Sequence, residues 1–125
     1  MIEVEEVILI HETLIEQFGG KKGIRDFNLL LSAINRPFGG IDKTLFYPTI
    51  YEQAGTLIES IVKNHPFIDG NKRTGYVLMR LFLMQHNFDI AASQDEKYEF
   101  VIQIASGMMS KEEIQDWILK HIKQL

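Results

Sequence analysis

The stretch "NHPFIDGNKRTGY", residues 64–76, places a histidine, a carboxylate, two glycines, an asparagine and two adjacent cations between segments with the pattern of amphipathic helices. Pro66 cannot continue the helix that precedes it, so the chain leaves that helix directly after His65. Asn71 then opens a second helix, whose first N–H groups have no intrahelical partner and carry about half a positive charge. The stretch predicts two helices joined by a polar loop.

The second helix, expected over residues 71–86, is unusually apolar. Its segment "YVLMRLFLM", residues 76–84, is interrupted only by Arg80. A helix that is apolar around most of its circumference is buried in a protein core. We therefore expect this helix at the centre of the fold.

Capping residues predict the remaining helices. Each expected helix follows a Ser, Thr or Asp that can accept from its first turn, or ends at a glycine or proline. The expected elements are a helix over 4–18 stopped by Gly19 and Gly20, a short helix capped by Asp26 and closed by Pro37, a helix over 50–64 opened by Thr49 and Glu52, and two more opened by Ser93 with Glu96 and by Ser110 with Glu113.

Two further expectations concern the segment between the second and third helices and the last helix. The segment "GGIDKTLFY", residues 39–47, alternates weakly and suggests a short strand or hairpin. Trp117, together with Ile114, Ile118 and Ile122, has the spacing of a core-facing stripe on the last helix. The predicted fold class is all-α, with about six helices around a buried central helix and a short hairpin-like flap, in one domain spanning residues 1–125.

Composition limits the function classes. The 125 residues, of which 46% are apolar and 24% charged, suffice for one core. A net charge of -4 argues against a dedicated nucleic-acid binder, and the absence of cysteine removes disulfides and thiol nucleophiles. The N-terminal segment is acidic where a signal peptide would be basic, and the most apolar run is too short for a bilayer. We expect a soluble, cytoplasmic protein that binds neither nucleic acid nor membranes.

The start of the second helix has the features of a phosphate site. Gly70 allows the backbone to approach a ligand closely, and Lys72 and Arg73 add two cations beside the free N–H groups. Asn71 is either the helix N-cap or a group that orients a phosphate oxygen, and the sequence does not separate these roles.

His65 and Asp69 add a base and a metal ligand to this site. An imidazole with an ordinary pKa of about 6.5, held at a loop mouth, suits general-base chemistry. Asp69 is a hard oxygen ligand of the kind that holds Mg²⁺ together with substrate phosphates. The two apolar residues between them, Phe67 and Ile68, are expected to anchor the loop in the core.

Each residue taken alone also has a structural interpretation. His65 alone fits a helix C-cap, Asp69 fits a turn in "DGN", and Lys72 and Arg73 fit a solvated helix edge. Cations in a first helical turn oppose the helix dipole, however, which favours a functional role. His11, in the middle of the first helix, is expected to pack or to form a hydrogen bond rather than to catalyse.

The stretch "HPFIDGNKRTG" resembles the signature of the Fic/Doc family, which runs H-P-F-x-D/E-G-N-G/K-R. The flanking segments "IHETLIEQFGGKKGIRDFNLLLSAINRP" and "SKEEIQDWILKHI" resemble the death-on-curing branch of that family. The resemblance implies an all-α Fic fold that uses ATP and Mg²⁺ to modify a protein hydroxyl. It also implies that His65 is the base and Asp69 the metal ligand, with the phosphates held by Gly70, Asn71, Lys72 and Arg73.

Two departures from the adenylylating members bear on the chemistry. Those members usually have Gly at the position of Lys72 and a second Arg at the position of Tyr76. Lys72 replaces an open backbone approach with a point charge, and Tyr76 cannot form a bidentate phosphate clamp. Death-on-curing proteins share both departures, which implies transfer of the γ-phosphoryl group. A translation elongation factor is the substrate that the likeness suggests.

Three function classes remain open: a phosphoryl-transferring toxin, an adenylylating enzyme (AMPylation) with the same base and metal, and a degenerate module that only holds nucleotide. The intact His65 and Asp69 argue against the third. We expect the flap to capture an extended segment of the protein target by strand addition. Its residues are Gly39, Gly40, Ile41, Asp42, Lys43, Thr44, Leu45 and Phe46.

Restraint of such an enzyme is expected in trans. Many Fic-family proteins carry an inhibitory helix with the pattern S/T-x-x-x-E-G/N, whose Glu pairs with the second Arg of the signature. The nearest segment here, "TLIEQFG" at residues 13–19, has Gln17 in place of that Glu, and Tyr76 replaces the Arg. The resemblance therefore implies a separate antitoxin that lays an amphipathic helix against the nucleotide pocket.

Overall fold

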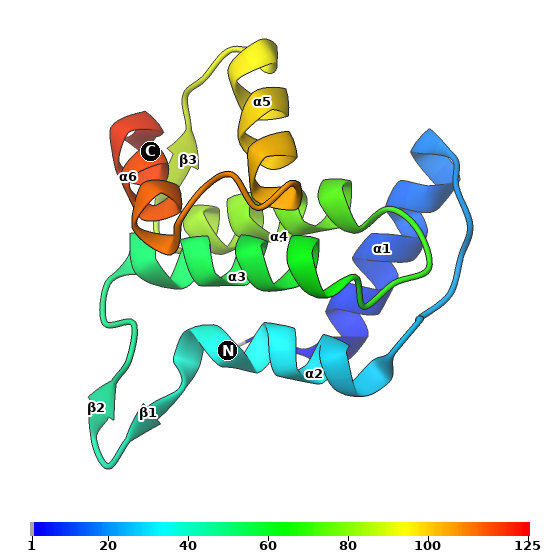
Figure 1. The fold of residues 1–125 in the computed structure, drawn as a ribbon, viewed down its shortest axis with the longest axis horizontal. Coiled ribbons are helices and arrows are strands. Elements are labelled where there is room, and N and C mark those ends of the chain that lie inside the picture. Colours follow the sequence, from blue (N-terminus) through cyan, green and yellow to red (C-terminus); the bar gives the residue numbers. More distant parts are fainter. Residues whose placement is uncertain (1) are drawn as a thin grey trace.

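A computed structural model describes residues 2–125 and confirms the all-α fold class (Figure 1). The helices within these residues are α1 (Val4–Phe18), α2 (Phe27–Asn35), α3 (Ile50–Asn64), α4 (Asn71–Gln85), α5 (Gln94–Ala105) and α6 (Lys111–His121). A 3₁₀ turn, η1 (Arg36–Phe38), follows α2. Two short antiparallel pairs complete the fold, namely β1 (Gly40–Ile41) with β2 (Thr44–Leu45) and β3 (Phe88–Ile90) with β4 (Ile122–Gln124).

The predicted helix starts are confirmed by their hydrogen bonds. The Asp26 carboxylate accepts from the Leu29 N–H at 3.0 Å and caps α2. Three helices open with complete capping boxes, in which the cap side chain and the third helical residue bond each other's backbone N–H groups. These boxes are Thr49 with Glu52 for α3, Ser93 with Glu96 for α5, and Ser110 with Glu113 for α6.

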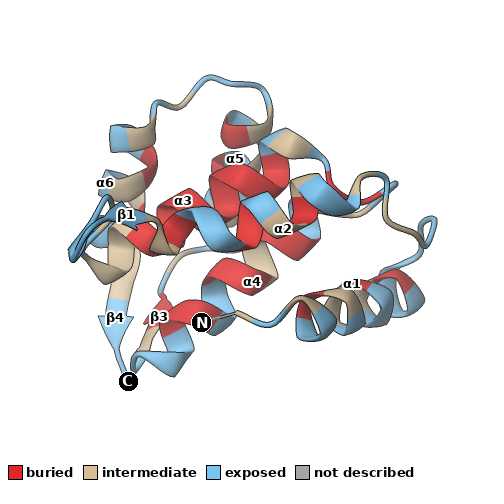
Figure 2. Ribbon diagram, turned by 90° about the horizontal axis from the view of Figure 1, so that it is seen from below, coloured by how far each residue is buried: buried red, intermediate tan, exposed pale blue. Residues whose placement is uncertain are grey.

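The central helix is α3, which corrects the expectation that residues 71–86 occupy the centre. Every residue over 53–62 is buried, and Figure 2 draws α3 largely in the colour of buried residues. α4 packs beside α3, and its Leu81 and Met84 are exposed. The polarity of α3 hid its position, because Gln53, Glu59 and Ser60 are buried together with hydrogen-bond partners from outside the helix. Glu59, for example, pairs with Arg36 at 3.0 Å.

The β3–β4 pair was not predicted from the sequence. Periodicity placed Ile122 on the core face of the last helix, but α6 ends at His121 and Ile122 pairs with Ile90 in the strand register. Strands of three residues are too short to show an alternation of their own. A bidentate ion pair ties β3 to α4, with Arg80 Nε and Nη2 donating to the two Asp89 oxygens at 2.8 and 3.0 Å.

The flap is the β1–β2 hairpin, and it projects away from the helices (Figure 1). Ile41 pairs with Thr44, so the turn consists of Asp42, whose φ is +58°, and Lys43. Gly40 is required by the pairing, since an added Cβ there would collide with the Thr44 carbonyl. All residues over 40–46 are exposed, as Figure 2 shows for β1. The predicted hairpin is therefore confirmed.

Within residues 2–125, no helix has both the length and the hydropathy needed to cross a bilayer.

Candidate functional site

The loop between α3 and α4 carries the predicted base at a strained backbone position. His65 is the C-cap residue of α3 and adopts the left-handed conformation, with φ +51° and ψ +57°. A residue with a Cβ rarely adopts this conformation, and Pro66 prevents the helix from continuing. The chain turns sharply at His65, and the loop returns to open α4 at Asn71.

The hydrogen bond of the His65 ring selects its tautomer. Nδ1 lies 3.0 Å from the Lys63 carbonyl oxygen, which can only accept, so Nδ1 carries the proton. In the neutral ring Nε2 is then unprotonated, and it has no hydrogen-bond partner among residues 2–125. The side chain is exposed. The geometry presents Nε2 to solvent as a proton acceptor, which is the arrangement that a general base needs.

Phe67 anchors the loop as predicted, but Ile68 does not. Phe67 is 1% exposed and stacks on the His11 ring with centroids 3.8 Å apart. Ile68 is 53% exposed, and its backbone N–H donates to the Gly23 carbonyl at 3.0 Å. A two-residue apolar pair in an extended loop cannot point both side chains to the same side, because successive side chains alternate. The expected anchoring by Ile68 is therefore corrected.

His11 is a buried hydrogen-bonding residue, as predicted. Its Nε2 donates to the Asp69 carbonyl oxygen at 2.8 Å, and its ring is 1% exposed. The stack on Phe67 and this hydrogen bond together fix the middle of the loop to α1. The role is one of support for the loop, without contact to solvent.

The Asp69 carboxylate is held by two backbone donors. The Lys21 N–H donates to Oδ2 at 3.1 Å and the Gly70 N–H donates to Oδ1 at 2.9 Å. These hydrogen bonds, that of Lys21 foremost, hold the pKa of Asp69 below its ordinary value. Gly20 packs against the same carboxylate, where an added Cβ would lie 2.8 Å from Oδ2. The carboxylate is thus ionised, exposed and fixed in place.

The start of α4 provides the predicted cluster of donors. Gly70 is the N-cap residue, with φ +76°, and the first intrahelical hydrogen bond runs from the Thr74 N–H to the Gly70 carbonyl at 3.0 Å. The N–H groups of residues 71–73 consequently have no partner within the helix. Lys72 is exposed beside them.

The structure separates the two roles considered for Asn71. Its side chain does not cap the helix. Instead Oδ1 accepts from the Phe67 N–H and Nδ2 donates to the Phe67 carbonyl, both at 2.9 Å, in a buried position. The side chain closes the loop, which leaves the Asn71 backbone N–H as the group that a phosphate could reach.

The Arg73 guanidinium stacks on the exposed aromatic ring of Phe18, at the end of α1. Its guanidinium carbon lies 4.3 Å from the centroid of the Phe18 ring, and Phe18 is 59% exposed. Such a cation–π contact restricts the long Arg side chain without consuming its N–H donors. The apolar residue at the end of α1 gave no signal of this role, because helix periodicity alone marks it as core.

A cleft of about 430 Å³ joins the start of α4 to α5. Residues 69–73, predicted as metal and phosphate ligands, line one wall of this cleft. The other wall was missed by the sequence interpretation, because α5 follows the loop by more than twenty residues and carries no motif. It includes the side chains Gln94, Lys97, Tyr98, Val101 and Ile102.

Tyr76 also lines this cleft, at the position where adenylylating members have a second Arg. Its hydroxyl is buried and has no hydrogen-bond partner among the described residues 2–125. Burial raises the pKa of Tyr76, so the hydroxyl stays protonated and uncharged at neutral pH. The residue contributes an apolar ring and no cation to the cleft.

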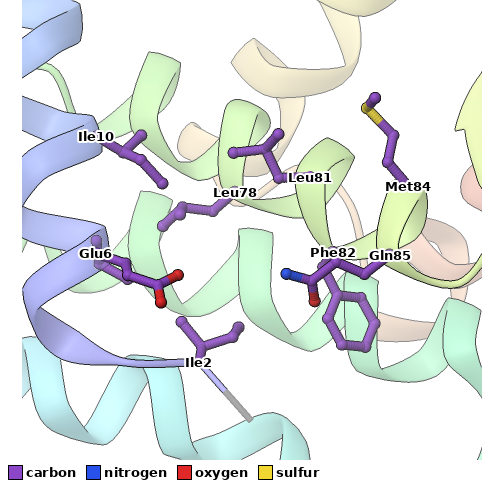
Figure 3. Close-up of a pocket in the computed structure, with 9 residues that line it drawn as sticks. Ile2, Glu6, Ile10, Leu78, Leu81, Phe82, Met84 and Gln85 are labelled. Atoms are coloured by element: carbon purple, nitrogen blue, oxygen red, sulfur yellow. The ribbon is translucent and has the colours of Figure 1, made fainter.

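A second hollow, of about 330 Å³, lies between α1 and α4 (Figure 3). Its lining is mainly apolar and includes Leu78 and Phe82 from α4 and Ile10 from α1, with Glu6 and Gln85 as its polar members. None of the residues predicted as catalytic or phosphate-binding lies there. We assign the candidate active site to the cleft at the start of α4, because Asp69, Lys72 and Arg73 line it. His65 does not line this cleft; it lies four residues before Asp69, on the loop that leads into α4.

Comparison with known proteins shows to which family this chain belongs. Residues 1–83 match the Fic/DOC family, and the chain belongs to this family. It is 36% identical over 78 residues to "Toxin Doc" of Mycolicibacterium smegmatis (strain ATCC 700084 / mc(2)155), a match that covers 62% of the chain and 60% of that protein. It is 27% identical over 118 residues to "Protein kinase doc" of Escherichia phage P1, across 92% of the chain and 90% of the relative.

Proposed function

We propose that this chain is a Doc-like toxin of a toxin–antitoxin pair, which transfers the γ-phosphoryl group of ATP to a Ser or Thr hydroxyl of a host protein. The observation that carries the proposal is the free Nε2 of His65, in a ring fixed by Lys63, on the loop that opens the helix with the anion-binding donors. The names of the two relatives, a toxin and a protein kinase, support the same class of activity.

In the proposed reaction, His65 Nε2 removes the proton of the target hydroxyl. The hydroxyl oxygen attacks the γ-phosphorus, the bond from that phosphorus to the β,γ-bridging oxygen breaks, and ADP leaves with the electron pair. Phosphoryl transfer depends mainly on positioning and on neutralising charge. The free N–H groups of residues 71–73 and the side chains of Lys72 and Arg73 supply donors and positive charge for the phosphates.

The donor set fits Mg²⁺. Within residues 2–125, no group of three or more His, Cys, Asp or Glu side chains could hold a metal by itself. Mg²⁺ is usually bound by one or two carboxylates together with substrate phosphates, and Asp69 offers one ionised, exposed carboxylate at the cleft. Each of its oxygens accepts one N–H and keeps a further lone pair. When bound, the ion would neutralise phosphate charge.

The cation content of the cleft favours phosphoryl over adenylyl transfer. Lys72 adds a point charge where adenylylating members have Gly, and the buried hydroxyl of Tyr76 stands where they have a second Arg. The site therefore lacks the bidentate clamp that would hold a second phosphate in the adenylylating orientation. AMPylation and simple nucleotide binding are the alternatives, and the mass added to a target protein distinguishes them from phosphorylation.

The flap supplies a surface for the protein target, which the family likeness suggests is a translation elongation factor. Ile41 and Phe46 are 65% and 58% exposed, and the two-stranded hairpin has free backbone edges. An extended segment that adds to one edge would gain main-chain hydrogen bonds and apolar contacts together.

Control is proposed to come from an antitoxin that occludes the nucleotide cleft. The cleft is open to solvent beside the exposed residues Lys72 and Tyr98, and the segment 13–19 carries Gln17 in place of an inhibitory Glu. An antitoxin that covers the cleft weakens ATP binding, and ATP weakens antitoxin binding by the same factor.

The test is to incubate the protein with ATP, Mg²⁺ and a bacterial lysate and to weigh the modified protein. Added mass of about 80 Da supports phosphorylation, about 329 Da indicates AMPylation, and no added mass contradicts both transferase functions. Asp69→Asn should lower the activity at limiting Mg²⁺ and recover partly at high Mg²⁺. Activity that is indifferent to the metal would refute the role assigned to Asp69.

A further inference from the structure

Arg25 donates to three consecutive carbonyl groups around the proposed base. Its Nε donates to the His65 carbonyl at 2.6 Å and its Nη2 to the Asn64 carbonyl at 2.7 Å. Its backbone N–H donates to the Pro66 carbonyl at 2.7 Å. One residue, 40 positions away in the sequence, thus binds the backbone on both sides of the imidazole.

The two side-chain hydrogen bonds of Arg25 lie at the carboxyl end of α3. The last carbonyls of a helix lack intrahelical donors and carry partial negative charge, so a guanidinium there is favourable. His65 also adopts the left-handed conformation, which is unfavourable in a residue other than glycine and persists only when its surroundings enforce it. The planar fork of Arg25 enforces it by fixing the Asn64 and His65 peptide groups together.

We propose that Arg25 is a positioning residue, which holds His65 in the left-handed conformation and so keeps its Nδ1 on the Lys63 carbonyl and its Nε2 free. The proposal rests on the function proposed above for His65. The ring hydrogen bond spans only two residues, from His65 to Lys63, and therefore depends on the backbone turn between them. A relaxed turn breaks this hydrogen bond, and the ring then samples both tautomers and other directions.

The chain offers a graded pair of variants and a matched control. Arg25→Lys keeps the charge but offers a single point donor, which cannot hold both carbonyls in the fork geometry, and Arg25→Ala removes all side-chain donors. Lys22→Ala removes a cation three positions away, whose exposed side chain pairs with Glu16 at 3.1 Å. The control therefore changes the same local charge without removing a contact to the loop.

Two measurements test the proposal. The first is the tautomer of His65 from ¹⁵N chemical shifts of the imidazole, at a pH where the ring is neutral. We expect the Nδ1–H form in the unchanged protein and in Lys22→Ala, and a mixture of forms in both Arg25 variants. The second is steady-state phosphoryl transfer. We expect kcat to fall about 10-fold in Arg25→Lys and about 100-fold in Arg25→Ala, with the KM for ATP within about 3-fold, because misplacement of the base affects the chemical step.

The outcomes separate this proposal from the proposed function. If Arg25→Lys keeps both the tautomer and kcat, Arg25 has no positioning role, even if phosphoryl transfer itself is observed. A fall in kcat with an unchanged tautomer also overturns the proposed route. If the unchanged protein transfers no phosphoryl group while the tautomer still depends on Arg25, the function fails and the positioning stands. Should Arg25→Ala unfold, Arg25→Lys decides by the same two readouts.

Discussion

Replacement of Gly20 by Ala should damage the proposed Mg²⁺ site at Asp69 more than the fold. An added Cβ at Gly20 would lie 2.8 Å from Asp69 Oδ2 and 3.0 Å from Ile15 Cδ1, so a neighbour must move. The nearest atom is the far end of a short side chain, which can rotate away cheaply. That rotation moves the proposed Mg²⁺ ligand off the Lys21 N–H, which now holds it at 3.1 Å.

Gly19→Ala is the matched control for the backbone cost. Both glycines have positive φ, +88° at Gly19 and +118° at Gly20, but a Cβ at Gly19 would meet nothing within 4 Å. Each substitution should therefore lower the free energy of unfolding by about 1–3 kcal/mol, the usual cost of a strained residue other than glycine. Urea denaturation of the two variants measures this loss of unfolding free energy, which we expect to be similar in both.

Any further difference in activity between Gly20→Ala and Gly19→Ala then measures the effect of displacing the Asp69 carboxylate. Loss of a group that orients a metal ligand typically costs about 10- to 100-fold in metal affinity or activity, so we expect this loss in Gly20→Ala alone. The assay is the initial rate of phosphoryl transfer as a function of Mg²⁺ at saturating ATP. Equal Mg²⁺ dependence in Gly19→Ala and Gly20→Ala would refute the assignment of Asp69 as the ligand or of Gly20 as its support.

Three further predictions concern the proposed base His65, the flap, and the ion pair between Arg80 on α4 and Asp89 on β3. His65→Ala should abolish transfer with little change in thermal unfolding, because the ring is exposed and packs against no core residue; full turnover in the folded variant would exclude His65 as the base. Proline scanning over residues 41–46 should raise the KM for the protein target and spare ATP binding, and equal loss of both would argue against strand addition. Arg80 holds the pKa of Asp89 below its ordinary value of about 3.9, so this pair stabilises the fold above that pH and the contribution disappears as pH falls through the lower, folded-state pKa. Asp89→Asn should lose this contribution, about 1–3 kcal/mol in urea denaturation at pH 7, and should unfold with a weaker dependence on acid pH than the unchanged protein.

The sequence alone determined the features that depend on neighbouring residues. The capping boxes of α3, α5 and α6 pair residues three positions apart, so they can be recognised in the amino-acid sequence. The same holds for the turn at His65 and Pro66 and for the donors at the start of α4. The family signature is one continuous stretch over residues 65–75, and the capping residues and helical spacing lie along the rest of the chain, so the family resemblance and the all-α fold class could both be inferred from the sequence.

The tertiary structure decided which residues support the loop between α3 and α4 and how the helices are ordered around it. His11, Lys21 and Arg25 contact the loop from 58, 48 and 40 positions away, and such pairs leave no periodic trace in a sequence. The central place of α3 was hidden for a related reason, since Glu59 is buried there beside Arg36, which lies 23 positions away in the sequence and reaches it only in the folded chain. Local backbone preferences and side-chain spacing can be read along the chain, whereas burial and hydrogen-bond partners of a polar group exist only after distant segments have packed together.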